Sequence, residues 1–275
     1  MQLGIDLDRF EHIRIAGPLC AVWLSVFSIP FFLYAGDPGI KGASWTTAVK
    51  EGCAAVIKTV REASKYPQLM KFLLARMFYA DGMAALLALS AVYVSLFLGW
   101  GFLEMTCYAL FGSLWAFGGG IFGGWLDTKI GVKRALFVEI TAMIIALILQ
   151  LSLTKDALLF GQFENYQVWD GLVFQTASDI SYLALVSIVA VAATASISSS
   201  RAMLVELAPA GRSGEFFGLF AIAGTITVWM GPLLVEWTTI GFNSQRIGMA
   251  SIAILFAIGL AILFFVEGKK PTQRR

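Results

Sequence analysis

Seven apolar segments of roughly 20 residues or more divide this sequence, and they constrain its fold more than any other feature. The hydrocarbon core of a bilayer is about 30 Å thick, and a helix of roughly 20 apolar residues crosses it. Only 14% of the residues are charged and 58% are hydrophobic, whereas water-soluble domains carry about 25% charged residues. We therefore expect an all-α polytopic membrane protein, embedded in a lipid bilayer, with about seven transmembrane helices at residues 13–34, 70–98, 105–126, 135–153, 180–199, 216–240 and 247–266.

Lysine and arginine alternate between the connections on the two sides of this expected bundle. From the N-terminal tail to the C-terminal tail, the successive connections carry two, five, none, three, one, two, one and four of these residues. Because cytoplasmic connections are enriched in positive charge, we expect the N-terminus outside and the C-terminus in the cytoplasm of a multi-pass protein of the cell inner membrane. A net charge of only +2 does not indicate a nucleic-acid partner.

Residue types that carry enzyme chemistry are scarce in this sequence. Its three cysteines lack the spacing of a metal site, and His12 is the single histidine. The last apolar segment contains no lysine that could form a retinal Schiff base, and the connection 154–179 is too short for a catalytic domain. We therefore predict no catalytic site, no cofactor and no bound metal.

A stripe of small residues in the third apolar segment leads into a charged turn. Gly112, Ala116, Gly120 and Gly124 recur every four residues, so they share one helix face that a neighbouring helix can approach closely. The turn resembles the loop motif of the major facilitator superfamily, which has a glycine, three residues, an aspartate, then a basic residue, a glycine and two further basic residues. The matching positions are Gly123, Gly124, Asp127, Lys129, Gly131, Lys133 and Arg134.

This resemblance implies a cytoplasmic gate. In the superfamily, the aspartate pairs with basic residues and with a nearby helix N-terminus, and it holds the gate in one state. Gly131 lies four residues after Asp127, where the common motif has three, but a glycine is still available for the tight turn. The alternative is that Lys129, Lys133 and Arg134 only set the topology.

The second apolar segment contains Arg76, Tyr79 and Asp81. Charged side chains at membrane depth cost about 2.5–3.5 kcal/mol and mark either a functional site or a paired structure. Two interpretations therefore stay open, a substrate or coupling site around these residues and a structural charge pair of Arg76 with Asp81. Asp179, at an outer helix end, is expected to be an ordinary solvated carboxylate.

Two residues of the sixth apolar segment are candidates for a hinge. Gly231 and Pro232 interrupt helical hydrogen bonding, because proline has no N–H group to donate. In a membrane such an interruption serves as a hinge, exposes backbone carbonyl groups or only shapes packing.

Motifs spread over the chain resemble the vacuole-effluxer-like, autophagy-related branch of the major facilitator superfamily. They are residues 14–18 (RIAGP), 72–82 (FLLARMFYADG), 199–201 (SSR), 207–209 (LAP), 215–219 (EFFGL), 231–232 (GP) and 245–246 (QR). The resemblance implies that the chain corresponds to helix six and the C-terminal six-helix half of a twelve-helix transporter, without the first five helices. It implies an N-terminal tail and sixth helix at 1–34, a cytoplasmic link at 35–67, the six-helix half at 68–268 and a basic cytoplasmic tail at 269–275.

The link contains apolar residues at helical spacing, with most of its basic residues on other faces. The apolar positions are Val49, Cys53, Val56, Ile57 and Val60. This pattern predicts a short amphipathic helix, either on the inner leaflet or packed on the bundle as a linker.

The resemblance implies secondary active transport of a small, amino-acid-like solute by alternating access. Asp81 is then a candidate proton-coupling residue. A pathway between two halves requires a partner, either a separate N-terminal transporter half or a second copy of the chain. The alternative function is that of a truncated, non-transporting membrane fragment or an interaction scaffold.

Overall fold

The structure is a computed structural model that describes residues 15–34, 44–209 and 213–267. The expected basic tail at 269–275 lies outside these ranges. The chain divides into two compact units, Met1–Cys53 and Ala54–Arg275, which we describe separately.

The first unit contains the apolar helix α2 (Ala16–Tyr34), which is long and apolar enough to cross a membrane. Helix α3 (Trp45–Ala63) begins in this unit and continues into the second. It confirms the predicted helix in the link, although the side chains of Cys53, Val56 and Ile57 lie outside the described part. The next helix begins at Pro67. The first N–H groups of a helix have no acceptor within it, so a proline at this position costs no hydrogen bond.

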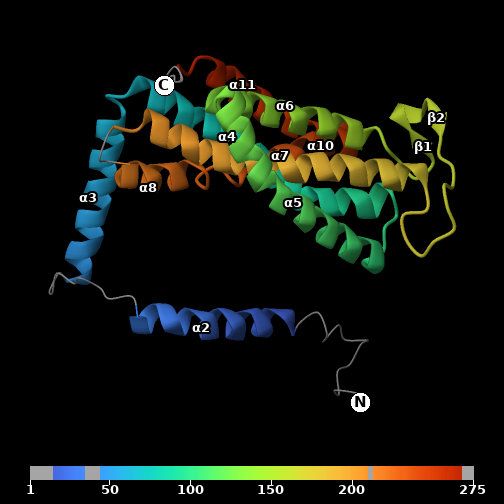
Figure 1. Cartoon of the computed structure of the whole chain (residues 1–275), viewed down its shortest axis with the longest axis horizontal. Coiled ribbons are helices and arrows are strands. Elements are labelled where there is room, and N and C mark those ends of the chain that lie inside the picture. Colours follow the sequence, from blue (N-terminus) through green and yellow to red (C-terminus); the bar gives the residue numbers. More distant parts are fainter. Residues whose placement is uncertain (1–14, 35–43, 210–212, 268–275) are drawn as a thin grey trace. The chain divides into compact units, whose positions relative to one another are not determined.

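The second unit is a bundle of helices (Figure 1), in which the predicted segments 70–98, 105–126, 135–153 and 180–199 each correspond to a single helix. The helices of the bundle are α4 (Pro67–Phe97), α5 (Phe102–Ile130), α6 (Val132–Leu151), α7 (Ala177–Leu207), α8 (Ser213–Ala223), α9 (Met230–Phe242), α10 (Gln245–Ala250) and α11 (Ile252–Phe264). Over the described residues of both units, five helical stretches are long and apolar enough to span a bilayer: α2, α4, α5, α7 and the consecutive pair α10–α11. The prediction of an all-α polytopic membrane protein is confirmed.

The expectation of one continuous helix over residues 216–240 is wrong. Helix α8 ends at Ala223, residues 224–229 form turns, and α9 begins at Met230. Pro232 cannot donate the hydrogen bond that a continuous helix would direct to the carbonyl of Val228. The break therefore lies just before the Gly231–Pro232 pair.

Helix α7 packs along both α5 and α6, while α4 packs along α11. The largest fully buried side chains at these contacts are aromatic, among them Phe72, Tyr79, Tyr182 and Phe256. The outer face of α5 carries exposed apolar side chains such as Leu110, Leu114 and Phe117. Such a face is expected where lipid, and not water, surrounds the helix.

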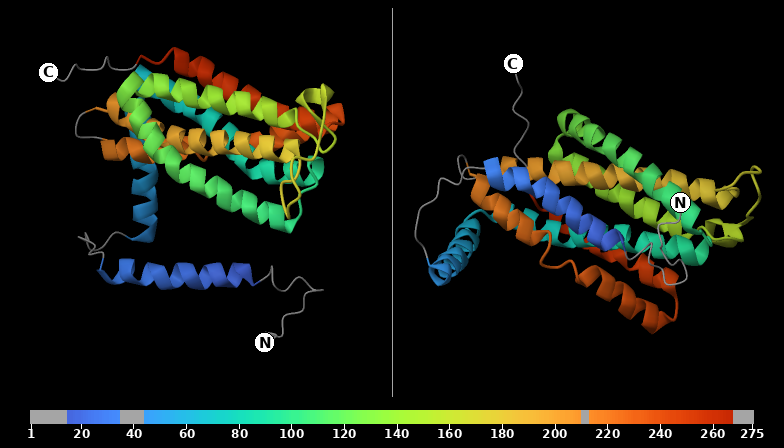
Figure 2. Two further views of the ribbon diagram at one scale, coloured as in Figure 1. Left: turned by 45° about the vertical axis from the view of Figure 1, so that its right-hand side comes forward. Right: turned by 90° about the horizontal axis from the view of Figure 1, so that it is seen from below.

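The connection between α6 and α7 contains the short antiparallel hairpin of β1 (Ala157–Leu158) and β2 (Phe163–Glu164), joined by the 3₁₀ turn η1 (Leu159–Gly161). The hairpin and the C-terminal end of α11 lie at opposite ends of this unit (Figure 2). Near the hairpin, Thr176 and Asp179 cap the start of α7, and the indole nitrogen of Trp100 donates a hydrogen bond of 2.6 Å to Asp179. Asp179 is only 9% exposed, so the expectation of a solvated carboxylate was wrong.

Candidate functional site

Asp81 lies on α4 beside the beginning of α9. Its side chain is 2% exposed and has no side-chain hydrogen-bond donor among the described residues, and the backbone N–H of Gly231 interacts with its carboxylate. Gly231, in the first turn of α9, is so close that an added Cβ would lie 2.6 Å from the Cβ of Ala85 and 3.5 Å from Oδ1 of Asp81. Only glycine lets this turn approach the carboxylate. The partial positive charge of a helix N-terminus favours an acid at this place.

Gly231 and Pro232 therefore lie in the first turn of a helix that follows a break, not at a kink within one helix. A proline in a first turn loses no helical hydrogen bond. The turn before α9, at residues 224–229, contacts α4. Its Thr227 hydroxyl donates a 3.3 Å hydrogen bond to the carbonyl of Met77. A hinge role of Gly231 and Pro232 stays a prediction.

Arg76 does not form the charge pair with Asp81 that the sequence left open. Its guanidinium lies 3.5 Å over the ring of Phe220, and its Nε donates to the Phe220 carbonyl at 3.4 Å. An added Cβ at Gly224 would lie 2.7 Å from Nη2 of Arg76, so α8 approaches the guanidinium closely where it ends. The guanidinium thus faces the end of α8, away from the acid.

Tyr79 is buried between α4, α7 and α11. Its hydroxyl is 2.8 Å from that of Ser200 on α7, and Ser200 in turn donates to the carbonyl of Ser196. An added Cβ at Gly259 on α11 would lie 2.9 Å from the Cβ of Tyr79. With 1% of its surface exposed, Tyr79 holds three helices together and is not open to a solute.

Asp127, the acid of the gate motif, lies near a second acid. The Ser199 hydroxyl of α7 donates to Oε1 of Glu139 on α6 at 3.0 Å, and the same hydroxyl interacts with the Asp127 carboxylate. Oδ1 of Asp127 and Oε2 of Glu139 are buried and have no partner among the described residues. The motif aspartate is thus linked to α6 and α7 through a serine, and no described basic residue pairs with it.

The remaining gate-motif residues take different positions. Gly131 joins α5 to α6 with φ of +85°, which confirms the predicted tight turn. The Lys133 ammonium donates to the carbonyl of Phe264 at the end of α11, at 2.9 Å. Lys129 and Arg134 are exposed. Lys133 therefore neutralises the negative end of a helix, an arrangement typical of basic side chains.

The close contact of α5 with α7 is offset from the predicted stripe of small residues. Added Cβ atoms at Gly119 and Gly123 would lie 2.6 Å from the carbonyl oxygen of Val191 and 2.8 Å from the Cα of Ala195. Gly124 has nothing within 4 Å of such an atom, and Gly120 makes only an ordinary contact at 4.0 Å. Of the gate-motif glycines, Gly123 is the one that brings the two backbones together.

Residues 8–274 match the family described as Vacuole effluxer Atg22 like. The chain belongs to this family. It is also 27% identical over 262 residues to an "Uncharacterized MFS-type transporter YxiO" of Bacillus subtilis (strain 168), covering 93% of this chain and 54% of that protein. The chain thus spans about half the length of this curated relative. The resemblance to the vacuole-effluxer-like branch is confirmed. No solved structure matches the chain.

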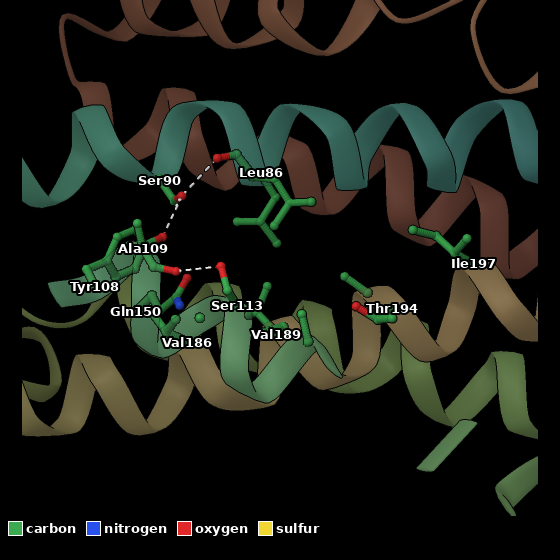
Figure 3. A pocket seen from close by; sticks show the side chains of 15 residues that line it. Leu86, Ser90, Tyr108, Ala109, Ser113, Gln150, Val186, Val189, Thr194 and Ile197 are labelled. Carbon is green, nitrogen blue, oxygen red and sulfur yellow. Dashed lines mark hydrogen bonds between the residues drawn. The ribbon is translucent and has the colours of Figure 1, made fainter. Parts of the chain in front are cut away.

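In this Atg22-like chain, a pocket of about 290 Å³ lies between α4, α5, α6 and α7. Figure 3 shows the hydroxyl groups of Ser90 and Tyr108, 2.9 Å apart, at one end beside Gln150, and Thr194 and Ile197 at the other. Its walls are otherwise mainly apolar, with side chains such as Leu86 and Val189.

Sequence reasoning missed the polar residues that this family member places inside the bundle. Ser199 and Ser200 contact Glu139 and Tyr79, and all four are at most 2% exposed. The signal was the run Ser196–Arg201 (SISSSR) within an otherwise apolar helix. Glu139 was visible in the sequence, but nothing in its spacing indicated its partner Ser199.

Proposed function

We propose that this chain is the C-terminal part of a secondary active transporter that moves a small, amino-acid-like solute by alternating access, with a proton gradient as the energy source. It would act with a separate N-terminal half or as a homodimer, in the cell inner membrane, with its N-terminus outside and its C-terminus in the cytoplasm.

The environment of Asp81 supports this proposal more than any other observation. A carboxylate that is 2% exposed, with no donor other than the backbone N–H of Gly231, is costly to keep charged. Binding a proton removes that cost, and exposing the site to one side of the membrane allows the proton to leave. Broken helices near the membrane midplane are where transporters of this kind bind substrates and coupling ions.

The break between α8 and α9 supplies an element that can move in such a cycle. Gly231 has no side chain to obstruct a shift against Ala85, and Pro232 leaves the carbonyl of Val228 without a helical donor. We propose that the first turn of α9 moves relative to α4 when Asp81 gains or loses its proton. The turn from Gly123 to Arg134 would form the cytoplasmic gate.

Uptake of radiolabelled amino acids by proteoliposomes tests the proposal. The chain is reconstituted alone, which permits homodimers, and together with the N-terminal half of the Bacillus subtilis relative. With an imposed proton gradient, we expect accumulation by the wild type in at least one of these preparations. Asp81→Asn should abolish gradient-driven accumulation but retain exchange of labelled for unlabelled solute.

Glu236→Gln is the matched control, because Glu236 is an exposed acid of α9. It should accumulate solute as the wild type does. If Asp81→Asn kept the wild-type dependence on the gradient, Asp81 would not be the coupling residue. If neither preparation transported any labelled amino acid, the alternative of a non-transporting fragment or scaffold would be favoured.

A further inference from the structure

A cavity of about 560 Å³ lies between the short hairpin and the adjoining ends of α6 and α7. Leu149 lines it from α6 and Ala184 from α7, while Leu159 and Phe163 line it from the hairpin. Among the described residues that form its walls, none carries a charged side chain, and most are leucine, alanine or aromatic. Such walls favour an apolar occupant, because a charged group placed there would lose its hydration without gaining a partner.

The connection between α6 and α7, at residues 152–176, holds one wall of the cavity in place. Before the hairpin, the N–H of Lys155 donates to the carbonyl of Phe97, the last residue of α4, at 2.9 Å. After the hairpin, the side-chain oxygen of Asn165 accepts from the N–H of Ser178 in the first turn of α7, at 3.0 Å. Because both flanks of the hairpin are attached to helix ends, its side chains have fixed positions at the cavity.

This connection exposes apolar side chains although its backbone is fixed. Phe160, Trp169 and Leu172 are 62%, 55% and 89% exposed. Leu159 and Phe160 have φ of +48° and +59°, in the left-handed region that bulky residues rarely adopt. Exposed apolar patches mark surfaces that contact lipid or a partner, and tryptophan and tyrosine are enriched where a bilayer meets water. The connection therefore has the composition of a segment that lies at the bilayer surface.

The cavity is continuous with the exposed apolar faces of the two helices. Ile180, Ala184 and Ile188 are exposed at every fourth position of α7, and Ile145 and Leu149 are exposed at the same spacing on α6. Leu149 and Ala184 belong both to these faces and to the cavity wall. Helix α7 is long and apolar enough to span a bilayer. An acyl chain that lies beside Ala184 therefore reaches the cavity without crossing a charged surface.

We propose that the cavity binds one acyl chain of a bilayer phospholipid, with the headgroup beside the hairpin. Tyr166 lines the cavity from the connection and is 64% exposed, as expected for a tyrosine at the level of the headgroups. A protein segment fits this cavity less well, because its backbone amides would need hydrogen-bond partners that mainly apolar walls lack. The proposal goes beyond transport, since the lipid would stabilise the connection between α6 and α7 whether or not the chain moves a solute.

Native mass spectrometry of the full chain, released from phosphatidylcholine nanodiscs, tests the proposal. We expect the protein to retain one phosphatidylcholine molecule after the surrounding lipid has been removed. Phosphatidylcholine with a diazirine group on one acyl chain then locates the bound molecule. Photo-crosslinks should be concentrated in peptides that contain Leu149, Phe163 or Ala184, relative to peptides with the exposed residues Leu110 and Leu114 of α5.

A cavity-filling substitution distinguishes this site from general contact with lipid. Ala184→Phe places an aromatic ring in the space of the acyl chain, so the affinity for the retained lipid should fall by about 10-fold. Ala257→Phe is the matched control, because it makes the same change at an exposed position of α11. It should retain lipid as the wild type does.

The left-handed turn supplies a second matched pair. Asparagine tolerates the left-handed conformation that Leu159 and Phe160 share. Leu159→Asn removes an apolar side chain from the cavity wall and should weaken lipid retention by about 3- to 10-fold. Phe160 does not line this cavity, so Phe160→Asn should retain lipid as the wild type does.

Four outcomes would overturn the proposal. Equal photo-crosslinking of the cavity peptides and of the outer face of α5 would indicate surrounding lipid only. Unchanged retention in a folded Ala184→Phe protein, or equal retention by Leu159→Asn and Phe160→Asn, would place the lipid elsewhere. A lipid-free dimer that Ala184→Phe converts to a monomer would mean that a second copy of the chain occupies the cavity. Thermal unfolding establishes that each variant is folded.

Discussion

The Ser199 hydroxyl donates a 3.0 Å hydrogen bond to the carboxylate of Glu139, and the two residues are buried on neighbouring helices α7 and α6. The motif acid Asp127, at the end of α5, lies beside them. Three helices therefore meet at a serine between two acids. This contact, together with the hydrogen bond of Lys133 to the carbonyl of Phe264, ties the charged turn to the bundle.

Replacing Ser199 with alanine should lower the free energy of unfolding by about 1–3 kcal/mol, because the buried Glu139 would lose its hydrogen-bond donor. Denaturant unfolding in detergent, followed by circular dichroism, measures the change. Ser187→Ala is the matched control on the same helix, since the Ser187 hydroxyl only donates to the carbonyl of Ala184. Equal effects of the two substitutions would contradict the role assigned to Ser199.

Replacing Glu139 with glutamine should raise the free energy of unfolding by about 1–3 kcal/mol at neutral pH. Glutamine keeps an oxygen that accepts from Ser199, while the buried negative charge near Asp127 is removed. The same unfolding measurement applies, with Glu236→Gln as an exposed control. If Glu139→Gln clearly destabilised the protein, a cation would have to neutralise the negative charges of Glu139 and Asp127 in the folded state.

Gly119 and Gly124 provide a matched pair for the contact between α5 and α7. Gly119→Ala should destabilise the bundle by about 1–3 kcal/mol, because the methyl group would overlap the carbonyl of Val191. Gly124→Ala has open space and should be neutral or stabilising by up to about 1 kcal/mol through helix propensity. Thermal unfolding measures the stability of both variants. If Gly124→Ala were the less stable of the two, the contact with α7 would lie on the other face of α5.

Lys133→Gln should reduce stability by about 0.3–1 kcal/mol, since the ammonium group interacts with the last carbonyl groups of α11. Lys129→Gln, at an exposed position of the same motif, should have no measurable effect. Unfolding at low and high salt distinguishes the two, because screening should diminish the effect of Lys133. If the two variants unfolded alike, the basic residues would act in topology alone.

The sequence was sufficient wherever a property depends on one segment. Segment length and apolarity predict the membrane class and most helices, because each transmembrane helix must satisfy its own backbone hydrogen bonds in lipid. Pro67 at a helix start and Gly131 in a turn follow from their own backbone chemistry. The charges of the second apolar segment were visible because any charge there is unusual.

The tertiary structure decided which of these residues meet. Helical spacing shows that Gly120 and Gly124 share a face, but the rotation of α5 against α7 makes Gly119 and Gly123 the points of contact. The hydrogen bond of Ser199 to Glu139, and that of Thr227 to the carbonyl of Met77, join segments more than 50 residues apart. Such pairings depend on how whole helices pack, and a linear pattern contains no information about the rotation of one helix relative to another.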